Sequence, residues 1–453
     1  MSTSLNAFRS GLYEEHLEEI SFLYTQTRFL REGEQPWQRA VNFEHRLEMH
    51  LDALVVGGTF ALNVCRRRAL DGDAGELFGA VSLYCRQEQP ALMAAVLKQI
   101  DPADEAQMTA VATALKYEMP QSWVTFVEQA LTRGDHRLVP LLASACGYRR
   151  IDCGAALLAA LKRSEQPPIE LVQALGRLHK RDAEADLKAL LARDLPALQS
   201  EVLLALLQLG DGSALNAHYL VAQQHDWPHL ALALGGDAGA CNVLMPNPAS
   251  GRVSRSSLLA LGLLGVPSTL RHLYECLAIP PLAEPAAQAM NWITGADLYE
   301  EAYVPAAVDE DELFPKELKA WRQYKEAPKA ADGRPFGSGQ RKLSTAPADW
   351  KQWFAANLQR FDAQLRYRRG IPLGPQQLVS DLAAPTTDNL LRHWSALELA
   401  IRYRYEQPFE TDMPVAAQVR AIQAMNRWLA ADARAFVPGA WYFDGRLMKQ
   451  EPS

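Results

Sequence analysis

Short phrases that end on a glycine recur along the middle of this chain. Each phrase is an apolar run with helical patterning, then a glycine, then a second apolar run. Four successive phrases are marked by glycines that lie 26, 29 and 30 residues apart, namely Gly210, Gly236, Gly265 and Gly295. A nearly constant step of ~30 residues with helical patterning is the signature of stacked helix pairs. The sequence therefore predicts an all-α protein built around an α-solenoid.

The same step extends towards the N-terminus. Segments that begin at Ala143, Ala174 and Ala205 align at steps of 31 residues. Small residues at these helix ends allow neighbouring repeats to approach closely, and turn glycines permit the left-handed backbone that ends a helix. In this register Leu206 and Leu261 each precede a turn glycine by four residues. We expect both leucines to be buried between helices.

Changes of pattern along the chain predict four segments. They are N-terminal helices at 1–71, the repeat array at 72–300, an acidic segment and linker at 301–347, and a C-terminal helical domain at 348–453. The acidic run is 309–312, and the stretch 327–341 is rich in Pro, Gly and Ser, which is typical of a linker.

The charge is distributed unevenly. The whole chain has a net charge of −7, but residues 321–453 carry 19 Lys and Arg against 13 Asp and Glu, so this region is basic and the rest is acidic. Such an asymmetry indicates two surfaces with different preferences. The six cysteines form no Cys-x-x-Cys pair, which favours buried thiols in a reducing compartment over a zinc site or a disulfide framework. No signal peptide or membrane-spanning run is visible, so we expect a cytoplasmic protein without a membrane association.

The repeats resemble a short form of the HEAT repeat found in phycobilisome-lyase-like proteins. The resemblance is carried by residues 258–267, LLALGLLGVP, followed by residues 284–295, EPAAQAMNWITG. A wider resemblance is carried by residues 46–54, 292–298 and 396–402, and it is to a family of short-HEAT-repeat proteins of Gram-negative bacteria that are often encoded near type VI secretion genes. This resemblance implies an accessory role in contact-dependent secretion, as an adaptor, chaperone or immunity-type partner. It supplies no catalytic residues.

Motifs that carry enzyme chemistry are missing from the sequence. His45 and His50 are five residues apart, which places them on different helix faces, whereas metal-binding helices favour a spacing of four. No His is followed directly by Glu, as in the His-Glu dyads of iron-binding HEAT-repeat enzymes. Neither a phosphate-binding Gly-Lys-Ser/Thr nor a nucleophile elbow occurs. We therefore expect no enzyme activity, no cofactor and no metal.

The strongest candidate for a binding surface is a cluster of arginines and aromatic residues in the C-terminal region. Its candidate partner-binding residues are Arg366, Arg368, Arg369, Arg392, Arg402 and Arg404. Interleaved Arg, Trp and Tyr are typical of protein interfaces and of single-stranded nucleic-acid grooves. The alternative is intramolecular, with this region docked on the acidic array.

More specific expectations follow for this cluster. We expect Trp394 and Leu397 to pack inward, while Arg368, Arg369 and Arg404 line a surface groove that faces the array or an acidic protein. The leading hypothesis is a non-enzymatic scaffold whose solenoid holds a protein partner, such as a secretion effector or a component of the secretion machine. A nucleic-acid-binding HEAT-like protein is the alternative, which the acidity of the whole chain disfavours.

Overall fold

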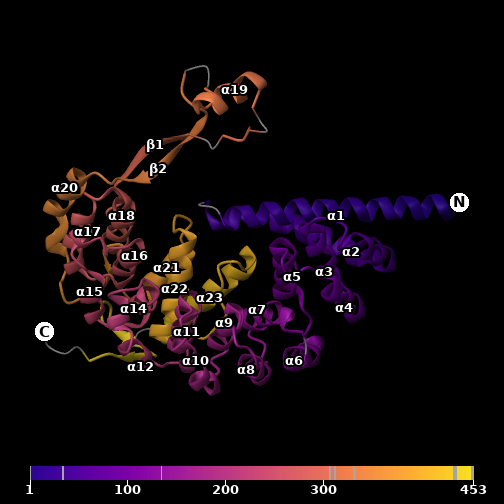
Figure 1. Ribbon diagram of the computed structural model, residues 1–453, viewed down its shortest axis with the longest axis horizontal. Coiled ribbons are helices and arrows are strands. Elements are labelled where there is room, and N and C mark those ends of the chain that lie inside the picture. Colours follow the sequence, from indigo (N-terminus) through magenta and orange to yellow (C-terminus); the bar gives the residue numbers. More distant parts are fainter. Residues whose placement is uncertain are drawn as a thin grey trace. The chain divides into compact units, whose positions relative to one another are not determined.

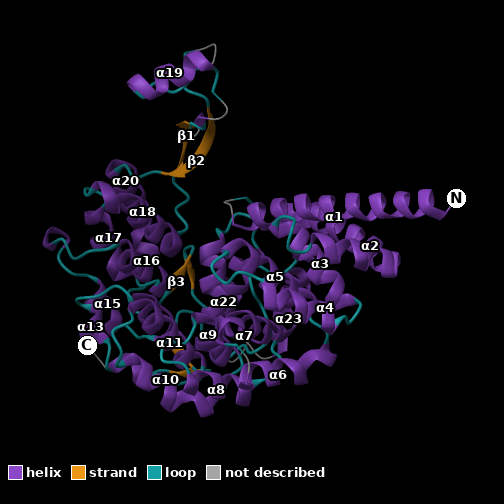
Figure 2. Cartoon of the chain, turned by 45° about the vertical axis from the view of Figure 1, so that its right-hand side comes forward, coloured by secondary structure: helices purple, strands orange, loops and turns teal. Residues whose placement is uncertain are grey.

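The computed structural model describes residues 2–32, 35–133, 135–305, 308–310, 313–329, 333–431 and 436–449. Within these residues the fold is predominantly helical, as Figure 2 shows. Up to residue 208 the α-helices are α1 (Ser2–Glu32), α2 (Val41–Arg68), α3 (Ala74–Arg86), α4 (Pro90–Gln99), α5 (Glu105–Glu118), α6 (Val124–Arg133), α7 (Val139–Arg149), α8 (Gly154–Arg163), α9 (Ile169–Arg177), α10 (Glu184–Leu191) and α11 (Pro196–Gln208). Four 3-10 helices interleave with them, η1 (Trp37–Ala40), η2 (Gln121–Trp123), η3 (His136–Leu138) and η4 (Arg181–Ala183).

The remaining helices are shorter on average. They are α12 (Ser213–Asn216), α13 (Tyr219–Ala222), α14 (His229–Gly235), α15 (Gly239–Leu244), α16 (Arg255–Leu264), α17 (Leu270–Cys276), α18 (Pro280–Thr294), α19 (Pro315–Tyr324), α20 (Pro347–Asn357), α21 (Pro375–Ala383), α22 (Asn389–Tyr403) and α23 (Val415–Ala431). Further 3-10 helices are η5 (Pro248–Ser250), η6 (Pro267–Thr269) and η8 (Leu358–Arg360).

Three short antiparallel ladders accompany the helices. They pair β1 (Tyr299–Pro305) with β2 (Gly337–Leu343), β3 (Tyr367–Arg368) with β4 (Ile371–Pro372), and β5 (Tyr442–Phe443) with β6 (Arg446–Leu447). The first ladder shows that the expected linker is partly structured. Residues 337–341 belong to β2, and α19 follows β1 and precedes β2 in the chain. Of the acidic run 309–312, residues 311 and 312 lie outside the described residues, as do residues 330–332 of the expected linker.

The chain forms two compact units that differ from the four expected segments. The first unit combines residues 1–243 with residues 373–453, and the second contains residues 244–372. None of the boundaries expected near residues 71, 300 and 347 coincides with this division. The C-terminal helices α21, α22 and α23 therefore share a unit with the N-terminal part of the chain.

In the first unit, alternate helices pack in chain order. α3 packs on α5, α5 on α7, α7 on α9 and α9 on α11, and Figure 1 shows α5, α7, α9 and α11 one after another. Small residues make the close contacts. A Cβ atom on Gly147 in α7 would lie 2.9 Å from Cα of Ala174 in α9, and one on Gly176 in α9 would lie 2.9 Å from Cα of Ala205 in α11.

The second unit repeats this contact, since a Cβ atom on Gly262 in α16 would lie 2.8 Å from Cα of Ala289 in α18. Leu206 and Leu261 are each 0% exposed, so the expectation of burial is confirmed. Of the four glycines that mark the repeats, Gly210, Gly265 and Gly295 have positive φ. Gly236 has φ −77° and ends α14 in an extended conformation instead.

The core around α21, α22 and α23 draws residues from both ends of the chain. Trp37 and Ala40 of η1 pack with residues of these helices, among them Leu378, Leu399 and Met425. The C-terminal helices thus depend on the N-terminal segment for part of their apolar cover. No helix among the described residues is long and apolar enough to cross a membrane.

A glycine-to-alanine pair tests the close contacts. Gly147→Ala should destabilise the protein by about 1–3 kcal/mol, because the new methyl group meets the backbone of the neighbouring helix. Gly11→Ala in α1 is the matched control, because nothing lies within 4 Å of the added Cβ. It should stabilise the helix by up to about 1 kcal/mol. Thermal unfolding of both variants measures the difference, and equal melting temperatures would contradict the contact.

Candidate functional site

Two of the predicted partner-binding arginines, Arg366 and Arg368, are fully buried in the second unit. Arg366 donates from Nε to the carbonyl of Leu264 at 2.8 Å and from Nη2 to the carbonyl of Leu263 at 3.3 Å. Arg368 donates from Nη2 to the same Leu263 carbonyl at 3.3 Å. These carbonyls belong to the last turn of α16, where backbone acceptors have no partner within the helix. The two arginines therefore cap a helix, which corrects the expectation that they form an exposed surface.

Arg402 has the same role in the first unit, where it is also fully buried. Its Nη2 donates to the carbonyls of Ala233 at 2.9 Å and Gly236 at 3.0 Å, at the C-terminal end of α14. Its Nη1 donates to the carbonyl of Tyr442 at 3.0 Å, and its Nε donates to the carboxylate of Glu398 at 3.0 Å. Glu398 is itself 0% exposed, so a buried ion pair on α22 is tied to the end of α14.

Arg392 is the fourth arginine that was predicted to be exposed and is buried instead. It donates to the carbonyl of Leu382 at 3.1 Å and to the side-chain oxygens of Asn389 and Gln418. Its guanidinium lies 4.5 Å from the ring centroid of Trp37, where a cation is attracted to the aromatic face. Burial lowers the pKa of Arg392 to about 10, since a low-dielectric site disfavours the charged form.

The remaining predicted residues do not form one groove. Arg404 is exposed at the end of α22 and pairs with Glu406, whereas Arg369 is half-buried and belongs to the second unit. The backbone amide of Arg369 donates to the carbonyl of Trp292 at 2.7 Å. Trp394 and Leu397, which were expected to pack inward, are half-buried. The sequence could not separate these cases, because buried and exposed arginines follow the same local pattern.

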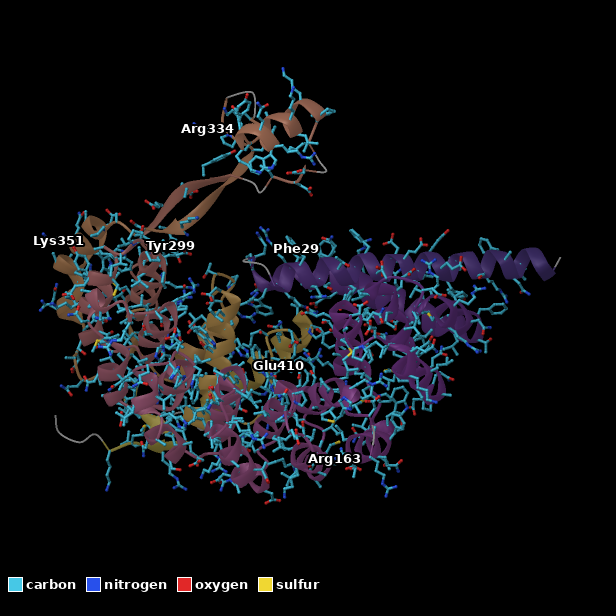
Figure 3. The ribbon with its side chains drawn as sticks, in the orientation of Figure 1. Phe29, Arg163, Tyr299, Arg334, Lys351 and Glu410 are labelled. Carbon is cyan, nitrogen blue, oxygen red and sulfur yellow. The ribbon has the colours of Figure 1, made fainter. Side chains whose placement is uncertain are left out.

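The segment between α22 and α23 lies against the ends of the successive helices. Glu410 is 8% exposed and accepts from Arg150 and Arg177, each at 3.1 Å. These arginines follow α7 and end α9, so one carboxylate bridges two neighbouring helices; Figure 3 labels Glu410. The pKa of Arg150 is lowered because burial outweighs the attraction of Glu410. Asp412 continues the contact by accepting from Lys116 at 3.1 Å.

A cavity of about 400 Å³ lies beside this segment. Its apolar wall includes Leu47, Leu51, Phe78 and Met413. Its polar wall is built from α1, α2, α5, α7 and α23, through Arg31, Glu44, Glu48, Lys116, Tyr117, Glu118, Tyr148, Arg149 and Arg420. A cavity of this size and lining falls at the lower end of ligand-sized pockets.

Hydrogen bonds already occupy much of the polar wall. Arg31 donates to Glu44 at 2.6 Å and to the hydroxyl of Tyr117 at 2.5 Å, and Tyr117 donates to the carbonyl of Asp412 at 2.5 Å. Burial opposes the charge of Arg31, but the attraction of Tyr117 and Glu44 outweighs it and raises the pKa. The second carboxylate oxygen of Glu44 accepts a hydrogen bond from the backbone amide of Val415 at 2.7 Å. Val415 is the first residue of α23. The polar wall thus fastens α23 to α1 and α2.

One face of α1 carries a row of exposed apolar side chains. We call Leu5, Phe8, Leu12, Phe22 and Phe29 the α1 stripe. Their exposed fractions run from 37% to 69%, and Figure 3 labels Phe29. The opposite face of the helix packs inward, with Leu17, Ile20, Leu23, Tyr24 and Thr27 buried. The sequence did not separate the exposed residues from the buried ones, because both sets are largely apolar.

Within the described residues, no group of three or more His, Cys, Asp and Glu is placed to hold a metal ion. The six cysteines are buried and unbridged. His16 of α1 and His50 of α2 face each other, with their Nδ1 atoms 3.0 Å apart. The histidine pair considered from the sequence was His45 and His50 instead. Comparison with family models, curated proteins and solved structures finds no match to this chain.

Two neighbouring arginines provide a test of the capping role. Arg402→Gln should destabilise the protein by about 3–5 kcal/mol, because it removes the cation paired with the buried carboxylate of Glu398 and the donor to several buried carbonyls. Arg404→Gln is the control, since Arg404 is exposed and its loss should cost less than about 0.5 kcal/mol. Denaturant unfolding followed by circular dichroism compares the two. Similar losses of stability would contradict the capping role.

Proposed function

We propose that this chain is a non-enzymatic scaffold that binds a protein partner through the α1 stripe. The observation that carries the proposal is the exposure of five large apolar side chains along one face of one helix, with Phe8 at 69% and Phe29 at 68%. Apolar side chains scattered singly are common on protein surfaces, but aligned aromatic and aliphatic groups are typical of an interaction site.

The scaffold that we propose is an α-solenoid of short HEAT-like helix pairs. Its support is the recurring contact between a glycine and an alanine of the next-but-one helix, at Gly147, Gly176 and Gly262. The chain-order packing of α3, α5, α7, α9 and α11 also fits a stack of repeats.

The resemblance of the sequence suggests what the partner does. We propose an adaptor, chaperone or immunity-type role in the cytoplasm, linked to type VI secretion, with a secretion effector or a component of the secretion machine as partner. The alternative of nucleic-acid binding rested on a basic and aromatic surface. The burial of Arg366, Arg368, Arg392 and Arg402 removes that support.

Replacing two side chains of the α1 stripe tests the proposal. Phe22→Ser/Phe29→Ser should reduce capture of the partner from an extract of the native host by at least tenfold. The physical reason is the loss of two aromatic anchors from the interface, each of which can contribute ~2 kcal/mol or more. Quantitative mass spectrometry of the captured proteins provides the measurement.

Leu220→Ser is the matched control, because Leu220 is 74% exposed in the same unit but lies on α13. It should leave capture unchanged. Both variants should retain the parent melting temperature, since exposed side chains contribute little to folding. Equal capture by the parent and the double variant would show that the partner does not use the α1 stripe.

A further inference from the structure

The α1 stripe belongs to a longer pattern with the spacing of a coiled coil. Positions 5, 8, 12, 15, 19, 22, 26 and 29 alternate steps of three and four residues along α1. Seven of these side chains are exposed, and Gln26 is half-buried. Alternating steps of three and four are the spacing of positions a and d in a heptad repeat. The pattern runs for about 36 Å at ~1.5 Å per residue, which is long enough to hold a partner helix along its length.

The middle of this pattern is acidic. Glu15 and Glu19 occupy its two central positions, and Glu18 lies beside them; all three are exposed. Within the described part of the chain, neither Glu15 nor Glu18 takes part in an ion pair, and Glu19 has only the half-exposed Arg46 at 3.3 Å. We call these three glutamates the acidic band. It separates an apolar end, Leu5 to Leu12, from another, Phe22 to Phe29.

Charge argues against a second copy of this chain as the occupant. In a parallel pair Glu15 would face Glu15 and Glu19 would face Glu19. In an antiparallel pair with both apolar ends in register, Glu15 would face Glu19 of the other copy. Either arrangement buries like charges opposite each other, which costs free energy and selects against that partner.

We propose that the α1 stripe and the acidic band together bind a partner helix that is apolar at both ends and carries Lys or Arg in the middle. This inference rests on the proposed function and names the chemistry of the partner segment. Apolar side chains at both ends supply the buried area, and the basic residues fix the register by facing the acidic band. From Leu17 to Thr27 the opposite face of α1 is buried where this helix packs on α2 and α3, so over this part the partner meets a helix that is already ordered.

The test uses the full chain and two designed helical peptides of four heptads. Both peptides carry Leu at the outer a and d positions, and the central a and d positions hold Lys in one and Glu in the other. The Lys peptide should bind the parent chain at least tenfold more tightly than the Glu peptide in isothermal titration calorimetry. Glu15→Lys/Glu19→Lys should reverse this preference, a result that a nonspecific apolar surface would not give.

Two controls keep the outcomes separate. Leu220→Ser should bind the Lys peptide as the parent does, and thermal melts should show that the charge-swap variant is folded. Equal affinity for both peptides, or no reversal, would overturn the inference. A self-association of the parent chain that Phe22→Ser/Phe29→Ser abolishes would mean that a second copy occupies the stripe. If the phenylalanine variant loses the host partner but the charge-swap variant captures it normally, the proposed function stands and the basic partner helix is wrong.

Discussion

The buried pair of Arg402 and Glu398 is the interaction on which the first unit depends. It lies within α22 yet reaches the end of α14, so it joins residues 169 positions apart in the chain. A fully buried ion pair is stable only when hydrogen bonds satisfy both charges, because removing each ion from water costs several kcal/mol of free energy. The carbonyls of Ala233, Gly236 and Tyr442 supply those bonds for the arginine. These hydrogen bonds hold α22 against the end of α14.

Other arginines repeat the same chemistry at other helix ends. Arg149 donates to the carbonyls of Lys116 and Tyr117 at the end of α5, and Arg163 donates to the carbonyl of Leu131 in α6. Short helices have many unpaired terminal carbonyls relative to their length, and a guanidinium can satisfy two or more of them. Short helices thus offer acceptors to exposed arginines, such as Arg149 and Arg163, and to buried ones, such as Arg366 and Arg402. This explains why a basic and aromatic composition in the C-terminal region does not amount to a basic surface.

An open surface that is both acidic and apolar lies on α1. The segment that contains Glu410 and Asp412 contacts the ends of α5, α7 and α9. These helix ends are therefore covered by another part of the same chain. The exposed face of α1 has no such cover among the described residues, and its buried face anchors it to α2 and α3. An ordered helix with one free face is suited to receive a second helix, because little conformational entropy is lost on its side of the interface.

Local patterns in the sequence were sufficient for the helical class, for the burial of Leu206 and Leu261, and for the left-handed turns at Gly210, Gly265 and Gly295. These features depend on neighbours within a few residues, where periodicity and glycine carry the information. Tertiary structure alone decided which arginines are buried, since the acceptors of Arg366 are backbone carbonyls 102 and 103 residues away and any residue type can provide them. It also decided which face of α1 stays open. Leu12 and Phe29 have the same apolar character as Ile20 and Leu23, and only the positions of α2 and α3 distinguish the exposed pair from the buried pair.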